Sequence, residues 1–345
     1  MFKRLLILCL LVVVLAVAGT GLWVWQGLNT LKTPVALSEP VLFNVEHGST
    51  FSGVARQLER NGLVKDSLWL RLWGRLHPDR NLIQAGTYEF ASGDTALAMV
   101  NKMVNGETKT WSVQFIEGWR FADLRAALER QDHLDLMSAG LTDAELMTRL
   151  GHPDEHPEGR FFPDTYVFTG QESDLDILRR AYDRMQSILQ EEWQGKADDL
   201  PYESPYEALI MASIVEKETG VPDERSQIAG VFVRRLEKGM RLQTDPTVIY
   251  GLGDSYDGNI TRKNLRTVTP YNTYRISGLP PTPIALPGRE AIHAALHPDE
   301  GESLYFVARG DGSHVFSRTL QEHQRAVREF QLRRRSDYRS SPQTQ

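Results

Sequence analysis

Cysteine is almost missing from this chain, which has 345 residues and a single cysteine, Cys9. That residue lies within an apolar run near the amino terminus, so the remainder of the chain can form no internal disulfide and must be stable through core packing alone. The position of Cys9, together with the absence of a G-x-S-x-G sequence, removes the easiest routes to a cysteine or serine nucleophile.

An excess of positive charge is also missing, because 45 acidic residues outnumber 39 basic ones and the net charge is -6. Phosphate binding requires a basic surface, so we expect no nucleic acid as the main ligand. His293 and His297 are one helical turn apart, as in some zinc sites, but there is no adjacent glutamate of the metalloprotease pattern and no obvious third ligand. We therefore expect no metal ion and no cofactor.

One long apolar run is present, at residues 5–25, and it is long enough to cross a bilayer as one helix. Lys3 and Arg4 precede this run, and the positive-inside rule therefore places residues 1–4 in the cytoplasm and the rest of the chain outside. A cleaved signal peptide is the alternative, because residues 16–18 resemble a cleavage site. The run continues past that site to Trp23 and Trp25, which suit the outer interface, and its length favours a retained anchor.

The chain after the anchor divides by pattern. Residues 26–41 show no clear period and are predicted to be a linker. In residues 42–110 a strand-like segment from Phe43 is followed by two helical stretches and a second strand-like segment at 85–90, in the order strand, helix, helix, strand. Residues 111–330 alternate short strands with helices, and residues 331–345 form a polar tail.

The most informative segment is the apolar helix predicted from Ser204 to Gly220. Ser204 is its expected cap, with Glu207 closing a capping box, and Gly220 is a plausible stop. The helix runs into Glu216 and Glu218, which project from opposite sides, so at most one of them can face a given cleft. Burial and the negative end of the helix dipole both favour a protonated carboxyl group at this place, although two solvated carboxylates are an alternative.

Two features are predicted beyond this helix. Residues 214–236 are typical of a helix, a turn and a second helix, with Arg234, Arg235 and Lys238 directed outward. Residues 304–308 and 314–316 are predicted to pair as a hairpin.

The strings around these features closely resemble one family. They are Ala212-Ser-Ile-Val-Glu-Lys-Glu-Thr219, Gln243-Thr-Asp-Pro-Thr-Val-Ile-Tyr-Gly251, Thr269-Pro-Tyr-Asn-Thr-Tyr274 and Gly278-Leu-Pro-Pro-Thr-Pro-Ile-Ala285. Their order and content resemble the YceG-like family, the endolytic murein transglycosylases, over nearly the whole chain.

The resemblance implies an α+β fold: a transmembrane helix, a LysM-like subdomain at 42–110 and a mixed α/β catalytic domain with its catalytic glutamate at a helix carboxyl end. It also implies that the catalytic glutamate is Glu218, with Glu216 as the alternative, the latter expected to be a structural carboxylate paired with a basic group. Lytic transglycosylases need one carboxylate, because the C6 hydroxyl of the sugar attacks its own anomeric carbon.

Five further residues are candidates for sugar subsites because they supply amide, carboxylate and aromatic groups in polar, proline-broken stretches: Gln243, Asp245, Tyr271, Asn272 and Tyr274. Turn formation and capping around Pro246 and Pro270 explain each of them equally well. Asp245 is in addition a candidate second carboxylate, which would matter for a hydrolase.

The resulting hypothesis is a single-pass inner-membrane enzyme with a periplasmic catalytic domain. It would cleave nascent peptidoglycan strands between N-acetylmuramic acid and N-acetylglucosamine, form 1,6-anhydro ends and terminate strand growth. Its expected partners are glycan strands and the peptidoglycan synthases or division machinery. Two alternatives remain open: a muramidase that hydrolyses the same bond, and a non-catalytic, membrane-tethered glycan-binding protein.

Overall fold

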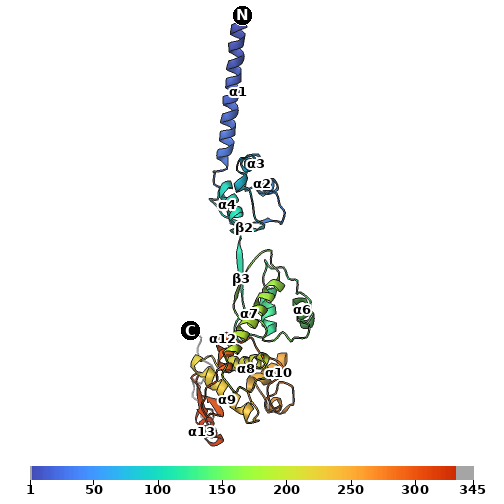
Figure 1. Ribbon diagram of the computed structural model, residues 1–345, viewed down its shortest axis with the longest axis vertical. Coiled ribbons are helices and arrows are strands. Elements are labelled where there is room, and N and C mark those ends of the chain that lie inside the picture. The colour runs from blue at the N-terminus through green and yellow to red at the C-terminus, as the bar shows by residue number, and fades with distance from the viewer. Residues whose placement is uncertain (1, 332–345) are drawn as a thin grey trace. The chain divides into compact units, whose positions relative to one another are not determined.

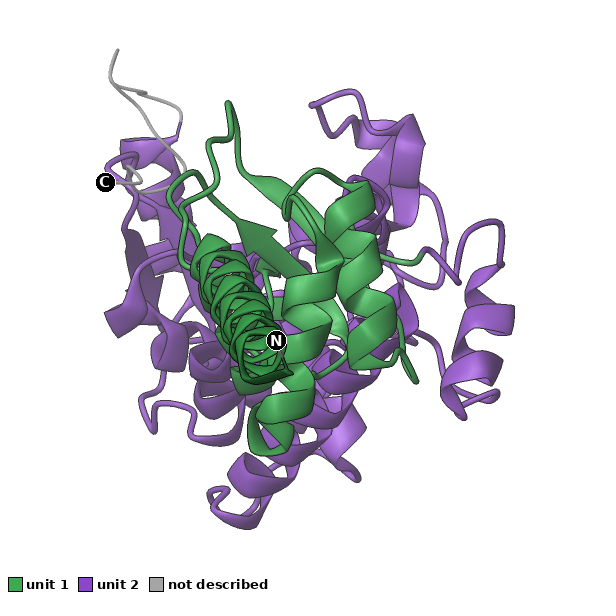
Figure 2. Cartoon of the chain, turned by 90° about the horizontal axis from the view of Figure 1, so that it is seen from above, with its two compact units in different colours: residues 1–111, 133–135, 167–172 green, residues 112–132, 136–166, 173–345 purple. Residues whose placement is uncertain are grey.

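The computed structural model describes residues 2–331, which form two compact units (Figures 1 and 2). Unit 1 comprises residues 1–111, 133–135 and 167–172, and unit 2 comprises residues 112–132, 136–166 and 173–345. Apart from Gln331, the polar tail predicted at 331–345 lies outside the described residues. The chain is a mixture of helices and short strands, so the α+β prediction is confirmed at this level.

The first helix, α1, is Phe2–Thr30 and is long and apolar enough to cross a membrane. Its apolar side chains are exposed along most of its length. The helix extends beyond the predicted span, because residues 26–30 of the predicted linker belong to it. After the helix, Leu31 is buried, and the amide of Val35 donates to the carbonyl of Asp94 at 2.8 Å.

Unit 1 contains the predicted order of strand, helix, helix and strand. Strand β1 (Val41–Val45) pairs antiparallel with β2 (Gly86–Phe90), and α2 (Phe51–Arg60) and α3 (Ser67–Leu76) connect them. The short helix η1 (Pro78–Arg80) and helix α4 (Ala96–Asn105) complete the unit's regular structure before residue 106. Phe43, Tyr88 and Phe90 fill the core, so the alternation in the two strands buries one face.

The carboxyl end of α1 packs against α3 within unit 1. The rings of Trp23 and Trp69 meet edge to face with their centroids 4.6 Å apart. Gly27 lies against the same indole, and a Cβ atom at that position would come within 2.1 Å of the ring of Trp69. Glycine therefore allows the close approach of α1 to α3.

Strands β3 (Thr110–Gln114) and β4 (Thr165–Thr169) form a second two-stranded sheet, and the boundary between the units runs through both. The helices of unit 2 are α5 (Phe121–Glu129), α6 (Asp143–Leu150), α7 (Asp174–Gln194), α8 (Pro205–Glu218), α9 (Arg225–Glu237), α10 (Asp245–Leu252), α11 (Arg262–Arg266), α12 (Arg289–Leu296) and α13 (Leu320–Phe330), with short helices η2 (Pro222–Glu224) and η3 (Gly253–Ser255).

Helix α8 lies at the centre of unit 2, where it packs against α7, α9, α10 and α12. Every residue from Ala208 to Val215 is buried, because the helix is apolar on all sides. The helix is partly accessible at Pro205–Glu207 and again at its last turn, where Lys217 is exposed. The last turn of α8 can therefore present polar groups to a ligand.

The predicted beginning of α8 is partly right. Ser204 caps the helix and accepts from the amide of Glu207, as predicted. The capping box is not formed, because the carboxylate of Glu207 accepts from the amide of Glu203 at 2.6 Å instead of that of Ser204. The helix ends at Glu218, and Thr219 is extended.

The predicted hairpin is present as β5 (Tyr305–Ala308) and β6 (His314–Ser317), which pair antiparallel. The prediction that Arg234, Arg235 and Lys238 point outward is confirmed for Lys238, which is exposed, and wrong for Arg235. Arg234 is partly buried and donates to the carbonyl of Ser303 at 2.9 Å. Arg235 is 7% exposed, and its guanidinium donates to the carbonyls of Leu304 at 2.7 Å and Leu242 at 2.6 Å. The hairpin covers this face of α9 and supplies acceptors that the helical pattern does not reveal.

Candidate active site

Glu218 lies at the last position of α8, in the partly buried region that follows the core of the helix. Burial raises the pKa of Glu218 to about 7, and the negative charge of Asp245 acts in the same direction. A hydrogen bond from Thr244 and the positive charge of Arg235 oppose the rise. Such a carboxyl group is substantially protonated at neutral pH, which is the condition for a general acid.

Thr244 holds the carboxyl group of Glu218. Its side chain is 2% exposed, and its hydroxyl donates to Oε1 of Glu218. The amide of Thr244 donates in turn to the hydroxyl of Thr273 at 3.1 Å, and Thr247 donates to the carbonyl of Thr244 at 2.9 Å. These three buried threonines fix the position of the donor, and the other oxygen of Glu218 remains available to carry a proton.

Glu216 is held in a different way. Its Oε2 accepts from the amide of Gly288 at 3.0 Å, and burial raises its pKa. Among the described residues it has no ion pair, so the expected basic partner is replaced by a backbone amide. Glu216 therefore connects α8 to the beginning of α12.

A cavity of about 460 Å³ lies next to the end of α8 in unit 2. Lys217, Pro246, Ile249, Tyr250 and Ile284 are part of its wall, and Gly118, Arg120, Asp123, Gly253, Asp254 and Tyr256 complete it. Glu218 is not in this wall, but its neighbour Lys217 is, and Pro246 follows two residues after Thr244. The volume is sufficient for part of a sugar chain.

A second perturbed carboxyl group adjoins the cavity. Glu158 is 4% exposed, and burial raises its pKa to about 7 although two donors stabilise its charged form. These donors are the amide of Phe121 at 2.9 Å and the hydroxyl of Tyr250 at 3.1 Å. Tyr250 also lines the cavity, so Glu158 is connected to the cavity wall through one hydrogen bond.

Three of the predicted subsite residues, Gln243, Asp245 and Tyr274, lie near Thr244: the first two flank it in the sequence, and Tyr274 is bonded to Asp245. Gln243 is exposed and has a φ of 53°, a left-handed conformation that a glutamine rarely adopts. Asp245 is exposed at the beginning of α10, and its Oδ1 accepts from the hydroxyl of Tyr274 at 2.7 Å. The backbone strain at Gln243 is of a kind often found at functional sites.

The other two predicted subsite residues have partners inside the protein. Asn272 is 1% exposed, and its amide donates to three backbone carbonyls, at Asn264, Leu265 and Thr267. Tyr271 is partly buried and shares a 2.9 Å hydrogen bond with the hydroxyl of Thr282. The structure therefore gives both side chains a scaffolding role in the loop that carries Tyr274.

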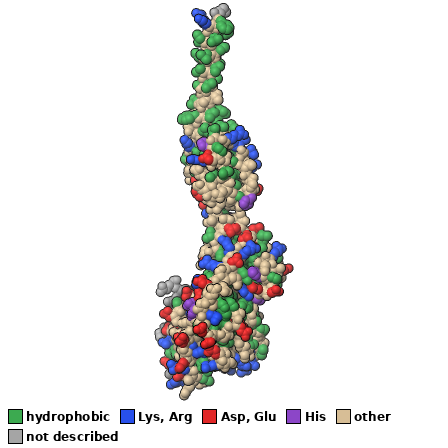
Figure 3. All heavy atoms as spheres, in the orientation of Figure 1, with side chains coloured by type: hydrophobic (Ala, Val, Ile, Leu, Met, Phe, Trp, Pro, Cys, Tyr) green, Lys and Arg blue, Asp and Glu red, His purple; other side chains and the backbone are tan. Residues whose placement is uncertain are grey.

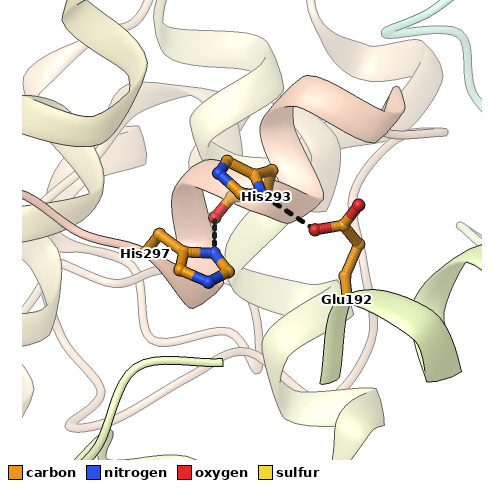
Figure 4. A group of neighbouring side chains, drawn as sticks. All are labelled: Glu192, His293 and His297. Atoms are coloured by element: carbon orange, nitrogen blue, oxygen red, sulfur yellow. Dashed lines mark hydrogen bonds and ion pairs between the residues drawn. The ribbon is translucent and has the colours of Figure 1, made fainter. Parts of the chain in front are cut away.

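The two histidines of the sequence have a third potential ligand close by. Glu192 on α7 accepts from Nδ1 of His293 at 2.8 Å, and His297 lies one turn further along α12 (Figure 4). Sequence reasoning found no third ligand because Glu192 is far away in the chain. Arg289 also donates to Glu192 at 2.8 Å, and both ring nitrogens of His297 lie within 3.1 Å of backbone carbonyl oxygens.

Comparison with known proteins identifies the family. The YceG-like family matches residues 43–329, and the chain belongs to this family. It is 32% identical over 307 residues, 84% of each chain, to a protein of Bacillus subtilis (strain 168) named endolytic murein transglycosylase.

Two further proteins are similar to the chain. A protein of the same name from Streptococcus pneumoniae (strain R6) is 25% identical over 325 residues, 84% of this chain and 58% of the relative. A crystal structure of a YceG-like protein from Listeria monocytogenes has 29% sequence identity and a TM-score of 0.51, covering 83% of this chain and 99% of that one.

Proposed function

We propose that the protein is an endolytic lytic transglycosylase that cleaves the bond between N-acetylmuramic acid and N-acetylglucosamine in nascent peptidoglycan strands and leaves 1,6-anhydro ends. The observation that carries the proposal is Glu218, a carboxyl group with a pKa of about 7 at the end of a buried helix whose preceding residue, Lys217, lines a cavity. The relatives named endolytic murein transglycosylase support the same reaction.

In the first step the protonated Glu218 donates its proton to the glycosidic oxygen, and the bond from that oxygen to the anomeric carbon breaks. The hydroxyl of Thr244 donates to Oε1, so the acid proton resides on Oε2. As positive charge develops at the anomeric carbon, the carboxylate that remains stabilises it.

In the second step the C6 hydroxyl of the muramic acid residue attacks its anomeric carbon, and its proton passes to Glu218. A 1,6-anhydro ring forms, the catalytic group regains its starting state, and no water is consumed. Burial and the charge of Asp245 raise the pKa of Glu218, and Thr244 and Arg235 limit the rise, which favours a group that both donates and accepts a proton near neutral pH.

The remaining parts of the proposal concern binding and location. Gln243, Asp245 and Tyr274 are proposed sugar-binding groups because they lie beside Thr244 with polar atoms at or near the surface. Unit 1 is proposed to be a LysM-like glycan-binding subdomain. Helix α1 is proposed to be a single-pass anchor in the inner membrane, with residues 1–4 in the cytoplasm and both units in the periplasm, where peptidoglycan synthases or division proteins would be partners.

Hydrolysis is a second candidate reaction, because Asp245 and Glu158 are additional carboxyl groups near Glu218 or the cavity. A muramidase would use one of them to activate water or to form a covalent intermediate. Asp245 accepts a hydrogen bond from Tyr274, and Glu158 is almost fully buried and is connected to the cavity wall through Tyr250. The anhydro and reducing ends of the products distinguish the two reactions.

Mass spectrometry of the fragments released from purified peptidoglycan by the full-length protein in detergent tests the proposal. We expect anhydro ends with the wild-type chain and with Glu216→Gln, and none with Glu218→Gln. Reducing ends would establish hydrolysis instead. Intact glycan with every variant, together with retained binding, would establish a glycan-binding protein.

A further inference from the structure

One face of α3 is unusual for a helix in contact with water. Leu68 is 40% exposed and Leu76 is 61% exposed, and Leu72, which lies between them on the same side of the helix, is only partly buried. Arg71 and Arg75 project from the adjoining stripe, since successive residues turn by about 100°. Leu68, Arg71, Leu72, Arg75 and Leu76 are called the α3 face below.

The α3 face carries positive charge that other groups do not neutralise. Residues 65–80 contain four basic side chains, Lys65, Arg71, Arg75 and Arg80, and two acidic ones, Asp66 and Asp79, a difference of +2 in a chain of net charge -6. Asp66 caps α3, and Oδ2 of Asp79 lies 3.7 Å from Nε of Arg80. Within residues 2–331 neither Arg71 nor Arg75 has a carboxylate partner. Figure 3 shows Lys and Arg side chains on the part of unit 1 beside the end of α1.

The position of the face follows from α1. Residues 5–25 match the thickness of a bilayer's hydrocarbon layer, and Trp23 is therefore at the level of the interface. Trp23 contacts Trp69 on α3, and Gly27 packs on the same ring. No free linker separates α1 from the rest of unit 1, because α1 continues to Thr30 and Leu31 is buried in the core of that unit. Helix α3 lies beside the end of α1 (Figure 1), so an α1 anchored in a bilayer would bring α3 to the level of the lipid head groups.

We propose that the α3 face is a second membrane contact, which binds the surface of an anionic bilayer. Leu68, Leu72 and Leu76 enter the interface, and Arg71 and Arg75 meet lipid phosphates, as in other interfacial amphipathic helices. The proposal rests on membrane anchoring by α1. Its consequence is that unit 1 is held against the membrane in one orientation and does not swing on a tether.

Spin-label accessibility in the full-length chain tests this contact. With the single native cysteine replaced (Cys9→Ser), labels are attached at Leu76→Cys, at Leu15→Cys within α1, and at Leu320→Cys on α13. Leu320 is a matched control, because this leucine is 53% exposed but belongs to unit 2. Each label is compared in phosphatidylglycerol vesicles for access to oxygen, which concentrates in lipid, and to a water-soluble nickel complex.

We expect the labels at positions 15 and 76 to favour oxygen and the label at 320 to favour the nickel complex. A label at 76 in water with the label at 15 in lipid would overturn the contact while leaving the anchor intact, and would point to a protein partner for the α3 face. A label at 15 in water would overturn both the anchor and the contact that depends on it.

The charge of the face is tested by Arg75→Gln, with Arg328→Gln on α13 as the matched control. Each arginine near an anionic surface should change the ratio of bound to unbound face about fivefold. We expect Arg75→Gln to shift the label at 76 toward water and Arg328→Gln to leave it unchanged. Equal burial of the label with Arg75→Gln, or in zwitterionic phosphatidylcholine vesicles, would overturn the role of the negative charge of the bilayer.

Discussion

The hydroxyl of Thr244 should set the upper pH limit of catalysis. It donates to Glu218 and so stabilises the charged carboxylate, which lowers a pKa that burial otherwise raises. Thr244→Val keeps the shape of the side chain and removes the donor. A hydrogen bond to a charged group contributes about 1.5–3 kcal/mol, and one pKa unit is about 1.4 kcal/mol, so the pKa of Glu218 should rise by about 1 to 2 units.

The sign of the effect on the rate follows from the role of the acid. Glu218 must be protonated to begin the reaction, so kcat/KM falls as pH rises through its pKa of about 7. In Thr244→Val this fall should occur at a higher pH. The assay is the pH dependence of anhydro-product formation by the full-length protein, with Thr244→Ser as the control that retains the hydroxyl. A fall at the wild-type pH in Thr244→Val, or the same shift in Thr244→Ser, would refute the reasoning.

Three further changes have defined outcomes. Glu218→Gln should raise the free energy of unfolding by about 1–3 kcal/mol at pH 8 and by much less at pH 5. The folded-state pKa of about 7 lies above the ordinary value of 4.5, so ionised Glu218 destabilises the folded state increasingly as pH rises from 4.5 to 7. Denaturant titration at both pH values measures this, and equal effects would contradict it. Tyr250→Phe should cost about 1 kcal/mol at pH 8 and less at pH 5, since the lost hydroxyl stabilises ionised Glu158; a larger loss at pH 5 would reverse the assignment. Gly27→Val should lower thermal stability in detergent by about 1–3 kcal/mol through its clash with Trp69, whereas Gly21→Val, which meets no atom within 4 Å, should not.

Local sequence signals predicted the helix that presents Glu218 well. A continuous apolar stretch, a serine cap and a glycine stop are all read within a few residues, and α8 begins and ends where they indicate. The capping box was predicted by the same rule and was wrong, because the amides of Glu203 and Ser204 are adjacent and compete for one carboxylate. Local rules identify an available donor but do not choose between neighbours.

The surroundings of Glu218 could not be predicted, because they depend on contacts between distant parts of the chain. Thr244 contacts Glu218 across 26 residues, and Arg235 is covered by a hairpin that begins about 70 residues later. The polar, proline-broken character of the segment that contains Thr244 selected Gln243 and Asp245, which lie on either side of the threonine.

The two bonds of Arg235 make the end of the catalytic unit hard to shorten. Its guanidinium joins the carbonyl of Leu304, at the start of the hairpin, to that of Leu242, which precedes the strained Gln243 and the hydroxyl of Thr244. A chain cut before residue 304 would leave this buried cation with one acceptor fewer and the loop with one fewer fixed point. The hairpin contributes no group to the reaction, yet a deletion study would classify it as essential.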